Sequence, residues 1–533
     1  MGEWESLGQR VLELAAQLVK VPSVVDTDGE GELARVLFQY LQDQTGGLAG
    51  VELKLIPVPK PTDCAAVFGF IPAKAQTTRT ILLMGHFDVV GLEPYGSLAG
   101  IAYDSDALKK SYADHSDPAL AEAAASPDWN FGRGWHDMKG GVAVITELFI
   151  REAQRRELPV NLVLLLTPDE ESASRGLRAL VPELLRLKRK LGLDFTRVLN
   201  ADYITPLFRG DTRKYLYSGT VGKLLLGLSV FGATTHAGET FDGVNAAALG
   251  GWLAQGMEHN RKLLQGAGGE WLPPPTVLHM GDKRRRYDVM TVEYAEVYVN
   301  MFHSGGEAKP LWRSIVHEVR RQANRYDREM RLRYNRFCAR ADIEPPRDTR
   351  KPEVIDFAEL LKHVRGRHSD ANARLEQFRG EAAEQFSDER DRAFHVVRKL
   401  YGLLPAGRAT VVVSLIPPFY PASVSPKGAE QAKLIKQYCR DHGLSHRWVY
   451  PYISDMSYFA FSKHTGLDYW KQQAPLWFTP EEIAGYLEIA APVVNLGPWG
   501  IGAHKETERV HLPFLRDELP KLLHGLMEKL CCY

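Results

Sequence analysis

The sequence contains short polar segments that combine histidine with carboxylates, the side chains that bind divalent metals. Residues 85–90 read GHFDVV, with His86 and Asp88 at the end of an apolar run typical of a β-strand. Open α/β sheets place their active sites at such strand ends. Alternate residues of a strand share a face, so we expect Asp88 to hydrogen-bond the His86 ring nitrogen that a metal would leave free. A single His-x-Asp is more often structural.

Carboxylates recur in three further segments. Asp137 lies in GRGWHDMKGG (132–141), a glycine-rich loop where an aspartate can bridge two cations or simply cap the following helix. TPDEES (167–172) follows the apolar strand 162–166. Its adjacent Glu170 and Glu171 point in different directions, so one can bind a metal while the other acts as general base; a solvated charge run is the alternative. Asp202, in NADY (200–203), stands at another strand end.

One more histidine follows near the C-terminus. His504 belongs to GIGAHKETERV (500–510), a glycine-rich loop that could present it to the same site. A single histidine in a loop is more often merely exposed. His504 is therefore a candidate for the site only in combination with the other segments.

Composition limits the class of protein. The chain has 533 residues, of which 44% are hydrophobic and 25% charged, so it is globular and long enough for two or more folding units. Formal net charge is zero, which argues against nucleic acid or anionic lipid as a partner, and no apolar run could span a membrane. Five scattered cysteines predict a reducing, cytoplasmic location and leave histidine and carboxylates as the metal ligands.

Hydrophobic patterning predicts how the elements are arranged. Strand-like runs at 51–57, 81–90, 162–167 and 198–202 alternate with helical patterns at 141–154 and 176–191, which favours a mostly parallel α/β sheet flanked by helices. The alternation of strand-like runs with helical patterns resumes at residue 409. We therefore expect a catalytic α/β domain formed by residues 1–219 and 409–533, with an α+β domain inserted at 220–408.

The inserted region contains a long, highly charged helical stretch. Residues 312–400 read as helix with a break at 345–346, and residues 311–340 contain nine arginines against three acidic residues, a local net charge of +6. The pattern fits a surface for an acidic partner or, as we favour, a solvated helix face. Residues 265–292 read as loop, followed by a strand at 290–302.

In this order, the five motifs resemble the co-catalytic zinc peptidases and deacylases. This family includes acetylornithine deacetylase, succinyl-diaminopimelate desuccinylase, aminoacylase, tripeptidase and carboxypeptidase G, and the enlarged insert is similar to its arginine-utilisation (RocB-type) branch. The resemblance covers residues 1 to about 250 and 405 to 533. It implies a zinc-exopeptidase type of fold with a lid and dimerisation domain.

The resemblance also implies roles for individual residues. The implied metal ligands are His86 and Asp202 for one ion, Glu171 and His504 for the other, and Asp137 as the bridge. Glu170 would be the general base, and Asp88 would orient His86. His236, in GATTHAG (232–238), would reach the site of a partner subunit and stabilise the developing oxyanion. The family's substrate-carboxylate clamp is not recognisable around Asn300.

These expectations lead to one preferred function. The chain is predicted to hydrolyse an amide bond in a small peptide or N-acyl amino acid, with two divalent ions per chain, Zn or else Mn or Co, and to form a homodimer through the inserted domain. The alternative is a catalytically silent, metal-stabilised amino-acid-binding or regulatory protein. Nucleic-acid binding is the least favoured function, because no nucleic-acid-recognition motif accompanies the basic helices.

Overall fold

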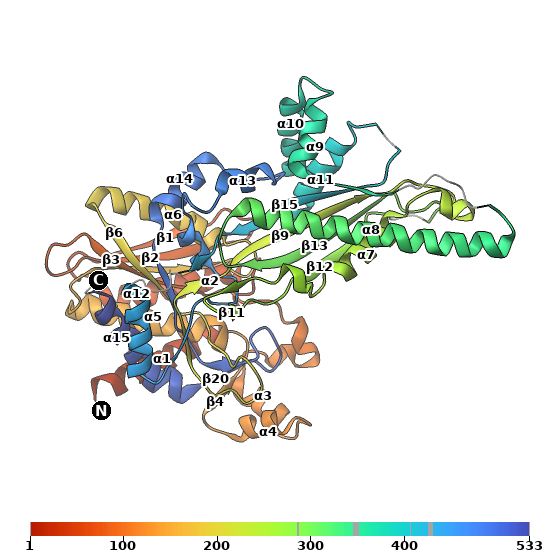
Figure 1. The fold of residues 1–533 in the computed structure, drawn as a ribbon. Coiled ribbons are helices and arrows are strands. Elements are labelled where there is room, and N and C mark those ends of the chain that lie inside the picture. The colour runs from red at the N-terminus through yellow and green to blue at the C-terminus, as the bar shows by residue number, and fades with distance from the viewer. Residues whose placement is uncertain (1, 285–286, 345–350, 406, 425–429, 532–533) are drawn as a thin grey trace. The chain divides into compact units, whose positions relative to one another are not determined.

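The chain folds into two compact units. The computed structural model describes residues 2–284, 287–344, 351–405, 407–424 and 430–531 (Figure 1). The first unit contains residues 1–220, 423–461 and 481–533, and the second contains 221–422 and 462–480. The predicted helix break at 345–346 lies outside the described residues.

The first unit is built on an eight-stranded mixed sheet. Its order is β1 (Glu52–Pro57), β2 (Ala65–Ile71), β5 (Asn161–Thr167), β3 (Arg79–His86), β6 (Asp194–Asn200), β18 (Val493–Asn495), β7 (Tyr215–Tyr217) and β17 (Ser445–Arg447). The central run from β5 to β18 is parallel, as is the β7–β17 pair, whereas β1, β2 and β5 pair antiparallel. The predicted mostly parallel α/β sheet is confirmed.

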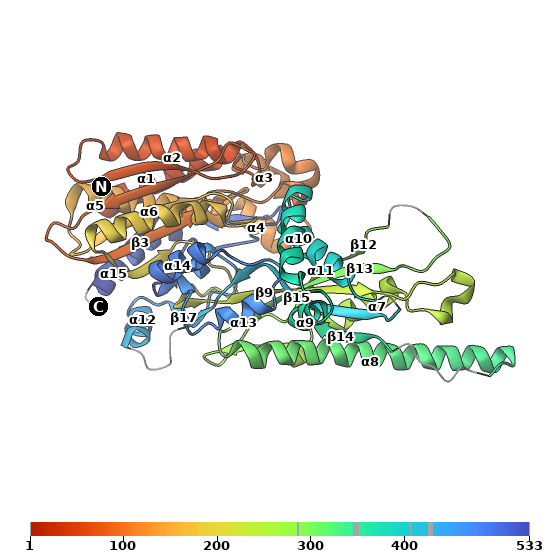
Figure 2. The same ribbon diagram turned by 90° about the horizontal axis from the view of Figure 1, so that it is seen from above.

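Helices cover both faces of this sheet. On one face lie α1 (Glu3–Val19), α2 (Gly29–Thr45), α5 (Gly140–Arg155) and α15 (Leu519–Cys531), and on the other lie α6 (Arg175–Leu191) and α14 (Pro480–Ile489) (Figures 1 and 2). Every residue of β5 is buried, which explains its continuous apolar sequence. Helix α5 is buried from Gly140 to Ala153 and forms the centre of its layer.

Shorter elements complete the first unit. They are η1 (Glu93–Ile101), α3 (Ser105–Tyr112), α4 (Pro118–Ala125), η2 (Trp135–Lys139), β8 (Gly219–Thr220), β16 (Ser423–Val424), α12 (Glu430–Asp441), η5 (Asp455–Ala460) and η6 (Phe514–Glu518). A small three-stranded sheet has the order β19 (Gly500–Ile501), β20 (Arg509–His511) and β4 (Trp129–Phe131). This sheet joins the loop that contains Asp137 to the loop that contains His504.

The second unit is built on a five-stranded sheet. Its order is β12 (Thr276–Asp282), β13 (Tyr294–His303), β9 (Gly222–Phe231), β15 (Thr410–Tyr420) and β14 (Glu353–Asp356), with only the last pair parallel. The other elements are η3 (Ala237–Asp242), α7 (Ala246–Met257), η4 (Arg261–Leu263), β10 (Gly266–Ala267), β11 (Glu270–Trp271), α8 (Ala308–Ala341), α9 (Phe357–Arg365), α10 (Ala371–Gln385), α11 (Glu389–Tyr401) and α13 (Leu467–Gln472).

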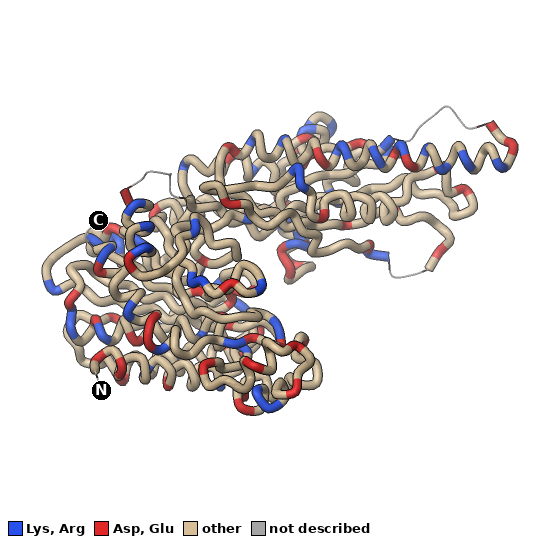
Figure 3. The backbone as a smooth tube through the Cα atoms, turned by 60° about the horizontal axis from the view of Figure 1, so that its bottom comes forward, with Lys and Arg blue, Asp and Glu red and all other residues tan. Residues whose placement is uncertain are grey.

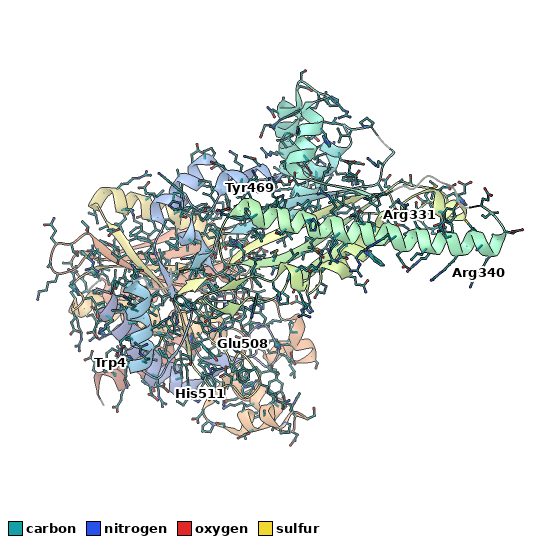
Figure 4. All side chains as sticks on the ribbon, in the orientation of Figure 1. Trp4, Arg331, Arg340, Tyr469, Glu508 and His511 are labelled. Atoms are coloured by element: carbon teal, nitrogen blue, oxygen red, sulfur yellow. The ribbon has the colours of Figure 1, made fainter. Side chains whose placement is uncertain are left out.

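Helix α8 runs along this sheet, and its C-terminal part extends past the neighbouring strands (Figures 1 and 2). Its buried side chains are concentrated before Tyr326, after which Cys338 is its one fully buried residue. Basic and acidic residues both occur along the helix (Figure 3), and Arg331 and Arg340 lie toward its far end (Figure 4). Arg331 pairs with Asp327 and Arg333 with Glu329, which agrees with a solvated helix face.

Three sequence-based expectations differ from the structure. The predicted loop at 265–292 contains β10, β11 and β12, and the predicted helical stretch 312–400 is interrupted by β14. The sequence predicts that residues from 409 onward belong to the first domain, yet β15 pairs with β9 and belongs to the second unit. An apolar run such as 410–416 fits either sheet equally well, so only tertiary packing decides where it pairs. Within the described part of the chain, no helix combines the length and apolar character needed to cross a membrane.

Candidate functional site

Three of the predicted segments meet at one edge of the large sheet. His86 is the last residue of β3, Glu170 and Glu171 follow β5, and Asp202 follows β6. The strands are parallel neighbours, with His86 opposite Thr167 and Met84 opposite Asn200. The carboxyl ends of parallel strands share one edge, so the register brings the four side chains to the same place.

Asp137 and His504 join this group from the loops around the small sheet. Oδ1 of Asp137 lies 3.1 Å from Nε2 of His86, and its Oδ2 lies 2.9 Å from Nε2 of His504. Nε2 of His504 is also 2.9 Å from Oε1 of Glu171. Asp137 therefore stands between the two histidines and has one oxygen directed at each.

The side-chain atoms are close enough to hold a metal ion. One ligand atom from each of His86, Asp137 and Glu171 lies within 4.8 Å of the other two. His86 and Asp137 are 4% and 3% exposed, so water competes little for them, while the side chain of His504 is 48% exposed and closes the site from outside. Imidazole nitrogen and carboxylate oxygen form a donor set that suits zinc and neighbouring divalent metals.

Asp202 is buried beside this group and is held through its backbone. Its N–H donates to Oδ1 of Asn495 at 3.1 Å, and Nδ2 of Asn495 donates to the Asp202 carbonyl at 2.9 Å. Burial, with the negative charge of Asp137, raises the pKa of Asp202 to about 7. The carboxylate thus shares the electrostatic environment of Asp137 and His86 without a direct hydrogen bond to either among the described contacts.

Asp88 contacts both His86 and the two glutamates. Nδ1 of His86 lies 3.1 Å from the Asp88 carbonyl and 3.5 Å from its Oδ1. The same carboxylate accepts the main-chain N–H of Glu170 at 3.2 Å and that of Glu171 at 3.1 Å. Asp88 is fully buried, and its contacts hold the backbone of both glutamates as well as the ring of His86.

Glu170 lies within the group but is farther from its atoms. Its Oε2 is 4.0 Å from Nε2 of His86, and its side chain is 8% exposed. Burial, together with the charges of Glu171 and Asp455, holds the pKa of Glu170 well above its ordinary value, although His86 acts in the opposite direction. A buried carboxyl whose pKa is raised accepts a proton more readily than a solvated one, which suits general-base chemistry.

Charges in the site are unbalanced in a way that favours cations. Burial and the negative charge of Asp137 raise the pKa of Glu171, despite its contact with His504. Burial opposes protonation of His504, yet Asp137 and Glu171 raise its pKa to about 11. Clustered buried carboxyls retain protons when no other cation compensates them, so bound divalent ions would relieve this repulsion.

A buried lysine that the sequence did not single out supports the double-glutamate loop. Nζ of Lys60 donates to Asp169 at 2.8 Å and to Glu30 at 2.7 Å, and all three side chains are fully buried. Asp169 has the left-handed φ of 64° and directly precedes Glu170. No sequence pattern identifies Lys60 or Glu30, because a lysine in the polar segment 58–64 reads as exposed.

A second buried pair, Arg133 and Glu508, lies between the Asp137 and His504 loops. Figure 4 labels Glu508 within the first unit, and its exposed fraction is 0%. Nη1 of Arg133 donates to Oε2 of Glu508. In the sequence, Glu508 stands in the charged run HKETER and is indistinguishable from a surface residue.

His236 belongs to the second unit, at the exposed turn that opens η3. Its Nδ1 accepts the N–H of Gly238 at 3.0 Å, and its backbone pairs with Met290. In the same turn, the ring of Phe241 stacks on Tyr334 of α8 at 4.4 Å between centroids and lies 5.2 Å from Phe337. The far part of α8 therefore packs against the turn that contains His236.

Comparison with known proteins identifies relatives of the whole chain. It is 27% identical over 537 residues to the protein RocB of Bacillus subtilis (strain 168), covering 97% of this chain and 94% of RocB. It is 29% identical over 533 residues to the uncharacterized protein YqjN of the same strain, covering 98% and 96%. The predicted resemblance to the RocB type is confirmed.

Solved structures show the same fold at low sequence identity. A tripeptidase from Staphylococcus aureus matches with a TM-score of 0.53 and 14% identity, covering 99% of both chains. Aminopeptidase PepT from Bacillus cereus matches with a TM-score of 0.51 and 14% identity, covering 98% of both chains. A metallo-carboxypeptidase from Sulfolobus solfataricus matches with a TM-score of 0.51 and 13% identity, covering both chains fully.

A family model matches residues 82–469, which is most of the chain and contains all the predicted site residues except His504. The model describes peptidase family M20/M25/M40. The predicted enzyme class, a peptidase-type hydrolase, is thereby confirmed. The chain belongs to peptidase family M20/M25/M40.

Proposed function

We propose that this protein is a two-metal hydrolase that cleaves an amide bond in a small peptide or an N-acyl amino acid. The observation that carries the proposal is the continuous series of contacts from His86 to Asp137, from Asp137 to His504, and from His504 to Glu171. A buried group of this composition has no evident structural purpose, because apolar side chains would stabilise the same sheet edge better.

In this proposal the chain holds two divalent ions. His86 and Asp202 would hold the first, Glu171 and His504 would hold the second, and Asp137 would be shared between them, which agrees with its two oxygens facing different histidines. Ions bound here would supply Lewis acidity, lowering the pKa of a water molecule and polarising the scissile carbonyl. We favour Zn, with Mn or Co as substitutes that the same ligands accept.

The remaining residues move the proton and keep the geometry. Glu170 accepts a proton from the attacking water and returns it to the leaving amine nitrogen, so that one residue serves as base and then as acid. Asp88 keeps the Glu170 backbone and the His86 ring in place through its contacts to both. Positioning of this kind matters because a displacement of about 1 Å at a reacting group can lower the rate about 10²-fold.

The second unit has a separate role in the proposal. We assign it as lid and dimerisation domain, in which His236 donates a hydrogen bond to the developing oxyanion in the site of a partner subunit. Its Nδ1 already accepts a hydrogen bond from Gly238, so the neutral ring carries its proton on Nε2, where it is available to a substrate oxygen. This hydrogen bond supports the donor role.

The substrate is expected to be small, and arginine derivatives are the first to test. The resemblance to the arginine-utilisation branch directs attention to N-acyl arginine and arginine dipeptides. A cytoplasmic location agrees with the buried thiols of Cys64, Cys338 and Cys439, which form no disulfide among the described residues.

A metal-dependent substrate screen tests the proposal directly. The protein is stripped with a chelator, reloaded with Zn, Mn or Co, and assayed on N-acyl amino acids and dipeptides, including those of arginine. Hydrolysis that requires the metal and is lost in Glu170→Ala supports the enzyme. Two bound ions without turnover of any amide would favour the amino-acid-binding or regulatory alternative.

A further inference from the structure

The buried ion pair between Arg133 and Glu508 occupies an unusual place in the first unit. Arg133 is 1% exposed and Glu508 is 0% exposed. Removing two charges from water is unfavourable, and apolar side chains of similar volume often stabilise a protein as well or better. The other contacts of the two side chains therefore indicate what the pair does.

Glu508 contacts the backbone of the Asp137 loop. While its Oε2 is paired with Arg133, its Oε1 accepts the N–H of Gly134 at 2.8 Å and the N–H of Asp137 at 3.3 Å. Gly134 has the left-handed φ of 87°, which favours glycine. One carboxylate oxygen thus fixes the course of the loop up to the residue proposed to bridge the two ions.

Arg133 makes the reciprocal contact with the His504 loop. Its Nη2 donates to the carbonyl of His504 at 3.2 Å. His504 has φ 67°, a left-handed conformation that a histidine adopts rarely and that needs support from its surroundings. The side chain of His504 is half exposed, so packing from outside contributes little to holding it.

The small sheet brings the two loops together, so that each residue of the pair contacts the backbone of the other loop. Strands β4 and β20 pair with Phe131 opposite Arg509, and the N–H of Gly132 donates to the carbonyl of Glu508 at 3.0 Å. Arg133, from the loop that contains Asp137, holds the backbone of His504. Glu508, from the loop that contains His504, holds the backbone of Asp137.

We propose that Arg133 and Glu508 are a positioning pair that sets the distance between the Asp137 carboxylate and the His504 ring, and thereby the geometry of the two-ion site. Neither residue is a ligand or touches substrate; each acts through the backbone of a ligand. The inference rests on the proposed function, because it requires that Asp137 and His504 bind metal.

Glu508→Gln tests the half of the pair that supports Asp137. A glutamine presents its NH₂ group either to Arg133 or to the main-chain N–H groups, so a donor faces donors and one set of contacts is lost. Asp137 is the proposed bridge, so both ions should bind about 10- to 100-fold more weakly, the usual effect of losing a residue that orients a ligand. The visible absorption of Co²⁺ bound to the variant should shift, while KM changes less than kcat.

Arg133→Lys tests the other half. Lysine keeps the positive charge beside Glu508. It lacks the planar guanidinium group, whose separate nitrogens donate to two acceptors at once, so the contact with His504 is lost. We expect the ion proposed to be bound by Glu171 and His504 to weaken, while the other ion keeps its affinity. This asymmetry distinguishes positioning from a general loss of stability.

An ion pair of the same unit with a buried carboxylate provides a matched control. Nε of Arg10 donates to Oε2 of Glu147 at 2.7 Å, and the side chain of Glu147 is 1% exposed. Glu147→Gln introduces the same chemical change in a buried carboxylate whose described contacts, with Arg10 and Tyr40, include none of the proposed ligands. It should lower the midpoint of thermal unfolding while the cobalt spectrum stays that of the wild type.

The measurements separate failure of this inference from failure of the proposed function. If the wild-type protein binds no metal, the two-ion site itself is wrong. If the wild type binds two ions and folded Glu508→Gln and Arg133→Lys bind both with unchanged affinity and spectrum, the positioning pair is refuted. The same holds if Glu147→Gln changes the spectrum equally. Should Glu508→Gln not fold, Arg133→Lys decides the question through its asymmetric loss.

Discussion

Nε2 of His504 lies 2.9 Å from Oδ2 of Asp137, although the two residues come from distant parts of the chain. The contact joins a loop near the C-terminus to the loop that precedes α5. Side chains that face each other in this way hold a metal by keeping both donor atoms at one point, and this relationship is the basis of the first prediction.

The chain is expected to bind two divalent ions, and each of His86→Ala and His504→Ala should reduce the metal content. Removing one nitrogen ligand leaves an incomplete donor set, so at least one ion is lost or exchanges rapidly. Elemental analysis after reloading and gel filtration measures the content. His115→Ala, an exposed histidine of the same unit, serves as control. Unchanged metal in both site variants would show that the ligands are wrongly assigned.

Glu170→Ala and Glu171→Ala are expected to differ. Glu170→Ala should abolish turnover with metal content near that of the wild type, because a general base is not a ligand. Glu171→Ala should instead weaken the second ion, since Oε1 of Glu171 contacts His504. Single-turnover assays and metal analysis on the same samples separate the two effects. The opposite result would mean that the two roles are exchanged.

His236→Ala is expected to lower kcat by about 10²–10³-fold, which is the usual effect of removing one oxyanion donor. Steady-state kinetics measures the change. His279→Ala, on edge strand β12 of the same unit, is the control. If His236 acts across a dimer, mixing the impaired His236→Ala chains with inactive Glu170→Ala chains should raise the activity above that of either variant alone. A fully active monomer in sedimentation analysis would exclude this role.

Glu30→Gln is expected to stabilise the protein at alkaline pH. Burial, with the charge of Asp88, raises the pKa of Glu30 from 4.5 to about 7, and its Oε1 has no hydrogen-bond partner among the described residues. Lys60 does not cancel this effect, because its single charge is shared with Asp169. The folded state therefore holds the Glu30 proton more tightly, so the stabilisation is complete below pH 4.5 and lost as pH rises through 7.

Thermal unfolding at pH 5 and pH 8 measures this prediction. The midpoint of Glu30→Gln should exceed that of the wild type at pH 8, by on the order of 2 °C, and approach it at pH 5. Glu32→Gln, an exposed acidic residue in the same helical turn, should show no such dependence. An equal difference at both pH values would mean that Glu30 is ionised throughout.

Phe241→Ala is expected to loosen the turn that contains His236. Its ring stacks on Tyr334, so removing it takes away the contact with α8 and exposes the backbone of η3. Amides of residues 237–242 should exchange hydrogen about tenfold faster, measured by mass spectrometry of peptides. Trp271→Ala, a 75% exposed aromatic residue of the same unit, provides the comparison. Unchanged exchange in Phe241→Ala would show that α8 does not support the turn.

The site could be predicted best where metal-binding side chains follow a regular strand. His86, Glu171 and Asp202 each follow an apolar run, and parallel strands bring their carboxyl ends together whatever the details of packing. The mostly parallel sheet could be predicted for the same reason, since strands alternated with helical patterns along the first two hundred residues.

The buried charged residues and the pairing of β15 could not be predicted. They depend on tertiary contacts that leave no pattern in the neighbouring sequence. Glu508 and Lys60 are buried charges in segments that read as solvated, and only the fold shows that partners enclose them. Strand β15 has the same apolar alternation as a strand of the large sheet, and its pairing with β9 is decided by neighbours far away in sequence. The spacing of His86 and Asp88 predicts their contact, but it gives no sign of the hydrogen bonds from the glutamate backbones to Asp88.

The stacking of Phe241 on Tyr334 has a consequence for comparison among relatives. Helix α8 and the turn after His236 are separate in the sequence, so each can be altered independently by mutation. If the stack is required, the two positions should change together: relatives with a shortened α8 should lack the aromatic residue at position 241, and relatives with the long helix should keep a ring at both. A comparison of RocB-like and YqjN-like sequences can therefore test the contact. Correlated substitution at the two positions would indicate that the stacking is required.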